Sequence, residues 1–236
     1  MLLPYCLFKA GDTPASLVGV GGLEVKYLQF EGIFMAYSDL GELNPRELLL
    51  QHTTPAESHP AVVFEHVIVA LHRDYTAIPI RFGEVIEDIP GARVLLSQHA
   101  ASIHRTLNQL GDKMEIVFKV DLPDASQNEL PEKLKKGNSK GVAYLRKRYE
   151  QLSNSSGSTT WVKDLEQAVV SQYQESLFDH KVEIKANQLS IFLLLLKGQS
   201  FNETAFAKLQ KKIPETTIVY KGSFPPYHFV RLQLKG

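Results

Sequence analysis

The pattern of hydrophobic and polar positions predicts three short strands at the start of the chain, over residues 3–8, 24–30 and 32–38. These segments are rich in β-branched and aromatic residues, and glycine, aspartate and proline separate them, as is typical of turns. Asn44 and Pro45 then resemble a helix N-cap followed by proline at the first helical position, which predicts a short helix through Gln51.

Hydrophobic residues at helical spacing predict two longer helices, over residues 60–73 and 91–110, with a strand at 76–80 between them. The face that the first helix is expected to bury consists of Val63, His66, Val67, Ala70 and Leu71. The stripe of the second consists of Leu96, Ala100, Ile103, Leu107 and Leu110, and Gly111 follows as a C-cap.

The second half of the chain predicts strands and helices in the order β, α, β, β, α, β. The strands are expected at residues 115–120, 181–185, 189–197 and 216–221, and the helices at 134–151, 161–178 and 202–212, the first two interrupted by a Ser/Gly-rich loop. Residues 191–196 are hydrophobic without alternation, which indicates a strand buried on both faces. This order is that of a ferredoxin-like domain.

The patterns together predict an α+β protein with two subdomains. The N-terminal one, residues 1–112, is a mixed α/β unit, and residues 113–222 form a modified ferredoxin-like βαββαβ unit. Residues 223–236 are expected to be a C-terminal tail that packs back on the protein.

Composition narrows the classes of partner. The chain has 236 residues, of which 44% are hydrophobic and 22% charged, as in a soluble globular protein. The 26 Lys and Arg balance the 26 Asp and Glu, so no bulk charge attracts nucleic acid or a lipid membrane. Cys6 is the only cysteine, which excludes an intramolecular disulfide and favours a reducing compartment. No hydrophobic run approaches membrane-spanning length and no signal peptide is evident, so a soluble, cytoplasmic protein is expected.

Candidate catalytic and ligand motifs are present, but their surroundings do not fit them. Ser139 lies in a Gly-Asn-Ser-Lys-Gly match to the nucleophile elbow, yet a charged run precedes it instead of a buried strand. The glycines of residues 19–22 precede a predicted strand, whereas a dinucleotide fingerprint requires a helix there. Glu84, Glu87 and Asp88 have no nucleophile nearby in sequence and are expected on the surface.

Histidines and basic residues offer two further alternatives. The eight histidines include no HExxH pair, and His66 is expected to be buried and hydrogen-bonded, with the others facing solvent. Residues 133–149 combine lysine, arginine and tyrosine, as a nucleic-acid surface would, but also as a solvated helix would. The sequence therefore predicts no catalytic residue, metal or cofactor. A ligand- or RNA-binding ferredoxin-like module and, less favoured, a serine hydrolase using Ser139 remain as alternatives.

Four pieces of sequence, in order along nearly the whole chain, resemble the gas-vesicle protein F/L family (GvpF/GvpL), the F members most. They are residues 19–22 (GVGG), the stretch from His66 to Gly83 with Pro79 near its end, residues 141–145 (GVAYL) and residues 222–229 (GSFPPYHF). The family commonly has tryptophan at the position of Phe224, so this chain keeps the aromatic character there.

The resemblance implies an accessory protein of gas-vesicle formation rather than an enzyme. It implies a minor vesicle component, located with the gas vesicle in the cytoplasm, that contacts the small hydrophobic shell protein (GvpA-type) and, as a further option, other vesicle accessory proteins. Such a factor would cover hydrophobic strands of the shell protein before they aggregate, through a sheet edge or an aromatic groove. The expected contact residues are Phe224, Pro225, Pro226 and Tyr227, since aromatics beside prolines form rigid surfaces.

Overall fold

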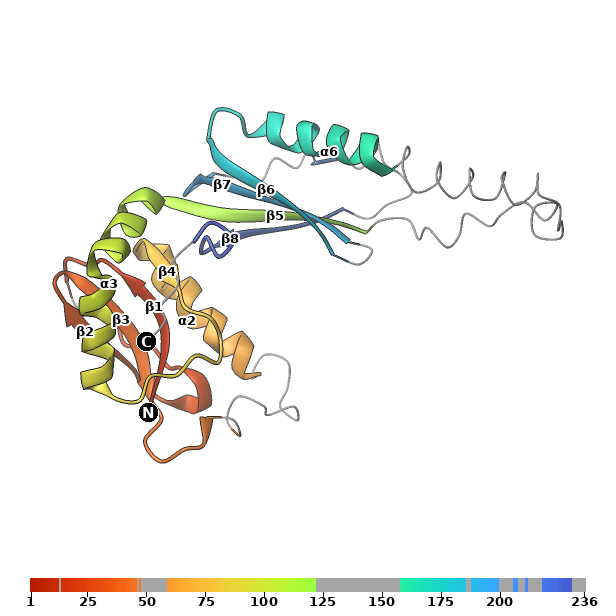
Figure 1. The fold of residues 1–236 in the computed structure, drawn as a ribbon. Coiled ribbons are helices and arrows are strands. Elements are labelled where there is room, and N and C mark those ends of the chain that lie inside the picture. Colours follow the sequence, from red (N-terminus) through yellow and green to blue (C-terminus); the bar gives the residue numbers. More distant parts are fainter. Residues whose placement is uncertain are drawn as a thin grey trace, which may run out of the picture. The chain divides into compact units, whose positions relative to one another are not determined.

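The protein has the predicted α+β class, with two four-stranded antiparallel sheets (Figure 1). The computed structural model describes residues 1–12, 14–45, 47, 59–121, 158–185, 188–199, 206–207, 211 and 218–230. Two compact units are present: Met1–Glu115 with Ser223–Gly236, and Ile116–Gly222. None of the helices within the described ranges is long and hydrophobic enough to cross a bilayer.

The first unit contains one sheet with the strand order β2-β3-β1-β4. Its strands are β1 (Leu2–Phe8), β2 (Val25–Phe30), β3 (Ile33–Asp39) and β4 (Ala77–Pro79), and its helices are α2 (Pro60–Asp74) and α3 (Ile89–Leu110). Leu3 and Phe8 of β1 belong to the hydrophobic core under α2, while Leu2 and Leu7 belong to the core under α3. Helices therefore cover both faces of this sheet, and every residue of β1 is buried.

A bulge in β1 sets which side chains face each helix. The register of β1 against β3 shifts between Pro4 and Cys6, which makes Tyr5 the extra residue. Proline has no N–H for a strand ladder, and a bulge is one of the places where a sheet tolerates it. As a result Tyr5 and Cys6, although consecutive, both belong to the core under α2.

The second unit contains the other sheet, with the order β6-β7-β5-β8. Its elements are β5 (Lys113–Asp121), α6 (Ser158–Gln172), β6 (Leu177–Lys185), β7 (Gln188–Leu196) and β8 (Ile218–Phe224). The first three residues of β5 and the last two of β8 belong to the first unit. The ring of Phe118 on β5 is a centre of its core, with ring centroids 5.5–6.4 Å from those of Tyr173, Phe206 and Tyr220. β7 is buried on both faces from Ile191 to Leu195, as its unbroken hydrophobic run predicts.

Most element positions agree with the sequence patterns, and α3 agrees best. Its stripe is buried at Leu96, Ile103, Leu107 and Leu110, and Gly111 with a φ of 47° ends it. Of the predicted helices at 45–51 and 202–212, only Pro45, Glu47, Phe206, Ala207 and Lys211 are described, and these are helical. The predicted helix at 134–151 lies outside the described residues.

Two expectations were wrong. The buried face of α2 consists of Phe64, Val67, Ile68, Leu71 and His72, so it is rotated relative to the predicted face. The rotation places the large Phe64 ring in the core, where it packs against Tyr5. His66 is consequently exposed and His72 is buried. The helix predicted over 161–178 ends at Gln172, and residues from Leu177 onward pair with β7 instead, because strand pairing outweighs local helix preference there.

Candidate functional site

The terminal segment, residues 222–229, is held to the first unit by a buried carboxylate. Glu115 lies near the start of β5, and its side chain is 3% exposed. The backbone N–H of His228 donates to Glu115 Oε2 at 2.8 Å, and His228 Nδ1 lies 2.7 Å from Glu115 Oε1. A buried carboxylate needs such donors, and two bonds from one residue fix both the position and the orientation of the segment.

The four predicted contact residues lie just before this anchor and differ in exposure. Pro225 and Pro226 are buried, Phe224 at the end of β8 is partly buried, and Tyr227 is 36% exposed. The N–H of Tyr227 donates to Pro225 O at 2.8 Å, which closes a tight turn. Partial burial, and secondarily the nearby Glu65 carboxylate, raise the pKa of the Tyr227 phenol. Of the four predicted contact residues, Phe224 and Tyr227 therefore present aromatic rings that are at least partly exposed, and the prolines support them.

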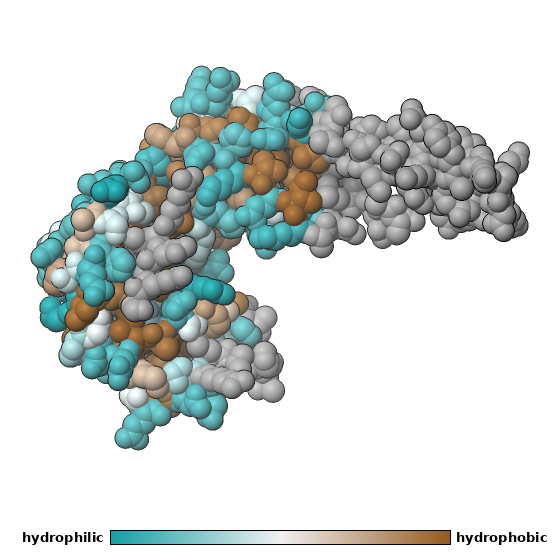
Figure 2. All heavy atoms as spheres, in the orientation of Figure 1, coloured by the Kyte–Doolittle hydropathy of each residue, from teal (hydrophilic) through white to brown (hydrophobic). Residues whose placement is uncertain are grey.

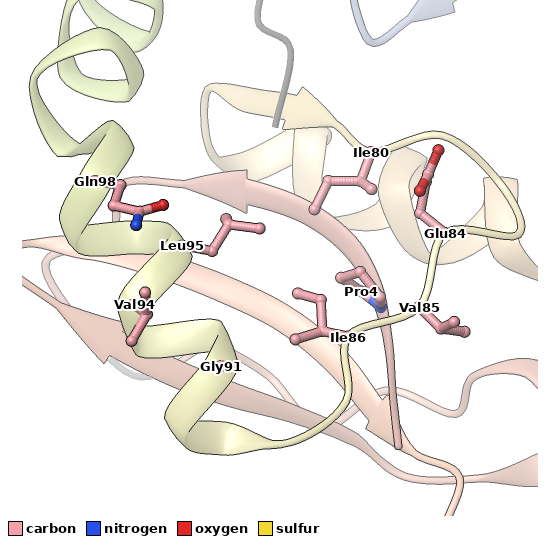
Figure 3. A pocket seen from close by; sticks show the side chains of 9 residues that line it. All are labelled: Pro4, Ile80, Glu84, Val85, Ile86, Gly91, Val94, Leu95 and Gln98. Carbon is pink, nitrogen blue, oxygen red and sulfur yellow. The ribbon is translucent and has the colours of Figure 1, made fainter. Parts of the chain in front are cut away.

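A hydrophobic pocket of about 560 Å³ opens elsewhere in the first unit (Figure 3). Figure 3 shows Pro4, Ile80 and Ile86 across from side chains of α3. Its lining consists of Pro4, Ile80, Glu84, Val85, Ile86, Gly91, Val94, Leu95 and Gln98. Val85 and Val94 are 42% and 55% exposed, so hydrophobic surface continues from the pocket onto the outside of the unit.

The pocket exists because the chain leaves the sheet edge beside Pro4. Ile80 N donates to Tyr5 O at 2.9 Å, and the chain rejoins β1 only at Ile86, whose N–H donates to Leu2 O at 2.9 Å. Pro4 has no N–H to offer a strand at that edge, so the intervening loop departs from β1. Asp88 then caps α3 through a 2.7 Å bond from Gly91 N to Oδ1. This capping, rather than acid–base chemistry, is the role that the structure gives Asp88.

The glycine turn at residues 19–22 supports the first sheet. Val20 N donates to the Tyr5 hydroxyl at 3.0 Å, and that hydroxyl lies 2.9 Å from Ser38 Oγ in a buried network. A Cβ at Gly19 would overlap the Tyr5 hydroxyl and lie 2.7 Å from Ser38 Oγ. Gly21 and Gly22 have positive φ angles of 68° and 75°, which glycine adopts at little cost. The turn is thus a packing device, not a phosphate-binding loop.

An aromatic chain connects the same network to the stretch that ends at Gly83. The Phe64 ring of α2 lies between Tyr5 and Phe82, with centroid distances of 5.0 Å and 5.2 Å. Gly83 follows with a φ of 90°, a backbone conformation that favours glycine. The motif residues around Arg81 therefore hold a loop against α2.

The remaining candidates for chemistry do not assemble into a site. Ser139, the basic stretch 133–149 and residues 141–145 lie outside the described residues. Among the residues that are described, no group of three or more His, Cys, Asp or Glu side chains could hold a metal ion. His59 caps α2 by accepting from Ala61 N at 3.3 Å, and His180 pairs with Glu166 at 2.9 Å. The contacts of His59 and His180 are thus structural.

Comparison with known proteins gives the family. Residues 2–231 match the family described as "Gas vesicle synthesis protein GvpL/GvpF". The chain belongs to this family. No curated protein matches the chain significantly.

Two solved GvpF structures have the same fold as this GvpL/GvpF family member. The crystal structure of GvpF from Anabaena sp. PCC7120 matches with a TM-score of 0.73 and 17% identity over 98% of each chain. That of GvpF from Microcystis aeruginosa matches with a TM-score of 0.68 and 17% identity, over 98% of this chain and 99% of the other. The conserved architecture at this low identity confirms the fold.

The sequence did not predict the residues that build the pocket or that anchor the terminal segment. The sequence predicts Glu115 only as the start of a strand, because its role depends on His228, which is 113 positions away. The pocket residues come from β1, the loop after β4 and α3, and they form no motif. Pro4 within a predicted strand was the one available signal, because proline in a strand marks an edge or a bulge.

Proposed function

We propose that this GvpL/GvpF family member is a gas-vesicle accessory protein that binds the hydrophobic shell protein and restrains its aggregation during vesicle nucleation and assembly. The family match over residues 2–231 carries the proposal. It includes a location with the gas vesicle in the cytoplasm, as a minor component, and no catalytic activity. Other vesicle accessory proteins are a further class of partner in this proposal.

The proposal assigns the second unit to the ferredoxin-like class. Its strand order β6-β7-β5-β8 is that of a βαββαβ unit in which β5 is the first strand. α6 precedes β6, and helical residues Phe206 and Lys211 lie between β7 and β8, where the second helix of such a unit belongs. The domain boundaries 1–112, 113–222 and 223–236 remain a prediction of the sequence.

The pocket in the first unit supports binding of a hydrophobic partner. Its walls are mainly aliphatic, and the exposed Val85 and Val94 extend them onto the surface. Hydrophobic surface of this kind is often functional in a soluble protein. A hydrophobic side chain of the shell protein entering this pocket would leave water on binding, which is the main driving force for protein association.

The terminal segment is the second contact surface in the proposal. Phe224 and Tyr227 are its contact residues, while Pro225 and Pro226 fix the backbone that presents them. The Glu115–His228 anchor keeps the segment ordered before binding, which lowers the entropic cost of association.

Sedimentation of refolding shell protein tests the proposal. With increasing amounts of this protein, the soluble fraction of shell protein should rise and the two proteins should co-migrate. An unrelated neutral protein of equal size serves as the control. No rise in solubility and no co-migration would contradict the proposal.

Matched variants then locate the surface. Val94→Lys places a charge at the pocket rim and should reduce co-migration, whereas Val18→Lys, at a position that is 69% exposed away from the pocket lining, should not. Tyr227→Ser tests the ring itself, and Glu115→Gln tests the anchor behind it. If the variants at the pocket and at the terminal segment all bind shell protein as well as the wild type does, neither surface is the contact site.

A further inference from the structure

The four edge strands of the two sheets differ in how well they are protected against pairing with another strand. β4 has three residues and ends in Pro79. β8 contains Gly222 and Ser223, the latter with a positive φ of 61°, which breaks a regular ladder. β2 has six residues. β6 has nine, with neither proline nor glycine, and none of the described residues pairs with its outer edge.

The two faces of β6 are chemically distinct. His180, Val182 and Ile184 lie opposite Leu193, Ile191 and Leu189, which are fully buried, so this face belongs to the core side. Lys181, Glu183 and Lys185 lie opposite Phe192, Ser190 and Gln188 on the other face. Lys185 Nζ and Glu183 Oε2 are 2.6 Å apart, consistent with a shared face.

We propose that two copies of this chain associate through β6, antiparallel and related by a two-fold axis through Val182. This register places Lys181 opposite Glu183 of the second copy, and Asp179 opposite its Lys185. The axis repeats each pair, so four opposite-charge pairs form across seven residues. Opposite charges directly across a strand pair stabilise it, and the edge-strand N–H and C=O groups gain partners.

The same charges disfavour the nearest other registers. An axis through His180 or Ile184 keeps only two opposite-charge pairs instead of four, and an axis through Lys181 or Glu183 brings like charges together. An axis through Lys181 would place the Lys181 side chains of the two chains against each other, and Glu183 against Asp179 of the second copy. An axis through Glu183 would place two carboxylates together and Lys181 against Lys185. Like charges directly opposite destabilise a strand pair. A shift that pairs an odd with an even position would put side chains on opposite faces of the sheet, which the pleat does not allow.

Hydrophobic side chains on the face of β6 that carries Val182 and Ile184 favour the same arrangement. Ile184 is 56% exposed, and the register places it beside His180 of the second copy, with the two Val182 side chains in contact on the axis. Figure 2 shows hydrophobic surface over the region of β6. Pairing therefore covers exposed aliphatic surface as well as an open edge, which favours a second copy as the occupant.

A charge-swap experiment with the full-length chain tests the inference by sedimentation velocity over a range of concentrations. Lys181→Glu places a carboxylate opposite Glu183 of the second copy, and Glu183→Lys places an ammonium group opposite its Lys181. Each variant alone should therefore self-associate at least about tenfold more weakly than the wild type. The double variant Lys181→Glu/Glu183→Lys restores both pairs, and an equimolar mixture of the two single variants should form mixed dimers. Restoration in the mixture shows that the single variants are folded.

Cross-linking tests the register. Val182→Cys places two thiols on the axis and should give a disulfide-linked dimer on mild oxidation, whereas Ile184→Cys should give far less, because its opposite residue is His180. The natural Cys6 is fully buried and does not interfere. A monomer at every concentration, failure of the mixture to associate, or equal cross-linking at both positions would each overturn the proposal. Loss of shell-protein binding in the single variants without any self-association would assign the edge to a shell-protein strand instead.

Discussion

The two sheets of this protein share one strand order and differ in what connects their first two strands. Counted along the chain, each sheet has the order second, third, first, fourth, as β2-β3-β1-β4 and β6-β7-β5-β8. In the second unit α6 lies on the connection from β5 to β6, whereas in the first unit the described residues between 9 and 24, all but Thr13, carry only the short 3-10 turn Val20–Gly22. Helix α3, which follows the fourth strand, supplies a covering layer for the first sheet.

Although the two sheets have the same strand order, different parts of them are exposed. In the first unit both faces of the central strand β1 are covered, and a hydrophobic pocket lies at a broken edge of the sheet. Among the described residues of the second unit, β6 is a long, regular edge strand. Two sheets with one strand order therefore differ in their exposed features, and these features are the basis of the two contacts proposed above.

Replacing Phe118 should have the largest effect and should disrupt the second sheet selectively. Phe118→Ala removes a fully buried ring that contacts Tyr173, Phe206 and Tyr220, so it should cost about 4 kcal/mol of unfolding free energy. Hydrogen exchange followed by mass spectrometry should show faster exchange in β5–β8 while β1–β4 stay protected.

Phe178→Ala is the matched control, because the Phe178 side chain in the same unit is 54% exposed. It should change the unfolding free energy by no more than about 0.5 kcal/mol. Equal loss of protection in both sheets on Phe118→Ala would mean that the two units unfold as one.

The glycine turn is the corresponding weak point of the first sheet. Gly19→Ala forces a methyl group into the buried Tyr5–Ser38 network and should cost about 3 kcal/mol, from overpacking and a broken buried hydrogen bond. Urea unfolding measures the change, with Gly11→Ala as the control, since nothing lies within 4 Å of a Cβ there. A Gly19→Ala protein as stable as the control would contradict the role assigned to the turn.

Local pattern predicted the elements that depend on neighbours in sequence. The stripe of α3, its Gly111 end and the doubly buried run of β7 all follow from spacing within about twenty residues. The pattern failed where long-range packing decides, as in the rotation of α2 toward Phe64 and the change from helix to strand at Leu177. These depend on partners that the local sequence does not contain, such as Tyr5 and β7.

The candidate surfaces were less predictable than the fold for the same reason. The terminal motif was found by resemblance, but its exposure pattern, with buried prolines and two presented rings, follows from the Glu115–His228 contact. The charge pattern of residues 179–185 is present in the sequence, but the sequence does not show that β6 is an edge strand, because this depends on the order of strands in the sheet.

Alkaline pH should weaken the first unit before the second, as the smallest of these effects. Burial raises the pKa of Tyr27 from 10.0 to about 12, and it also raises the pKa of Tyr5, Tyr227 and, in the second unit, Tyr220. Above pH 10 the unfolded chain releases the Tyr27 proton, whereas the folded chain keeps it until about pH 12, so the unfolded state binds fewer protons and stability falls over this window.

Tyr27→Phe removes one such group, together with its 2.8 Å bond to Ala15 O. Its unfolding free energy should therefore be slightly lower than that of the wild type at neutral pH and should decline less steeply between pH 10 and 12. Urea unfolding at several pH values gives both quantities. Because three of the four described tyrosines with a raised pKa lie in the first unit, hydrogen exchange in this window should increase first in β1–β4. Earlier loosening of β5–β8 would show that the tyrosine burial of the first unit does not control its alkaline stability.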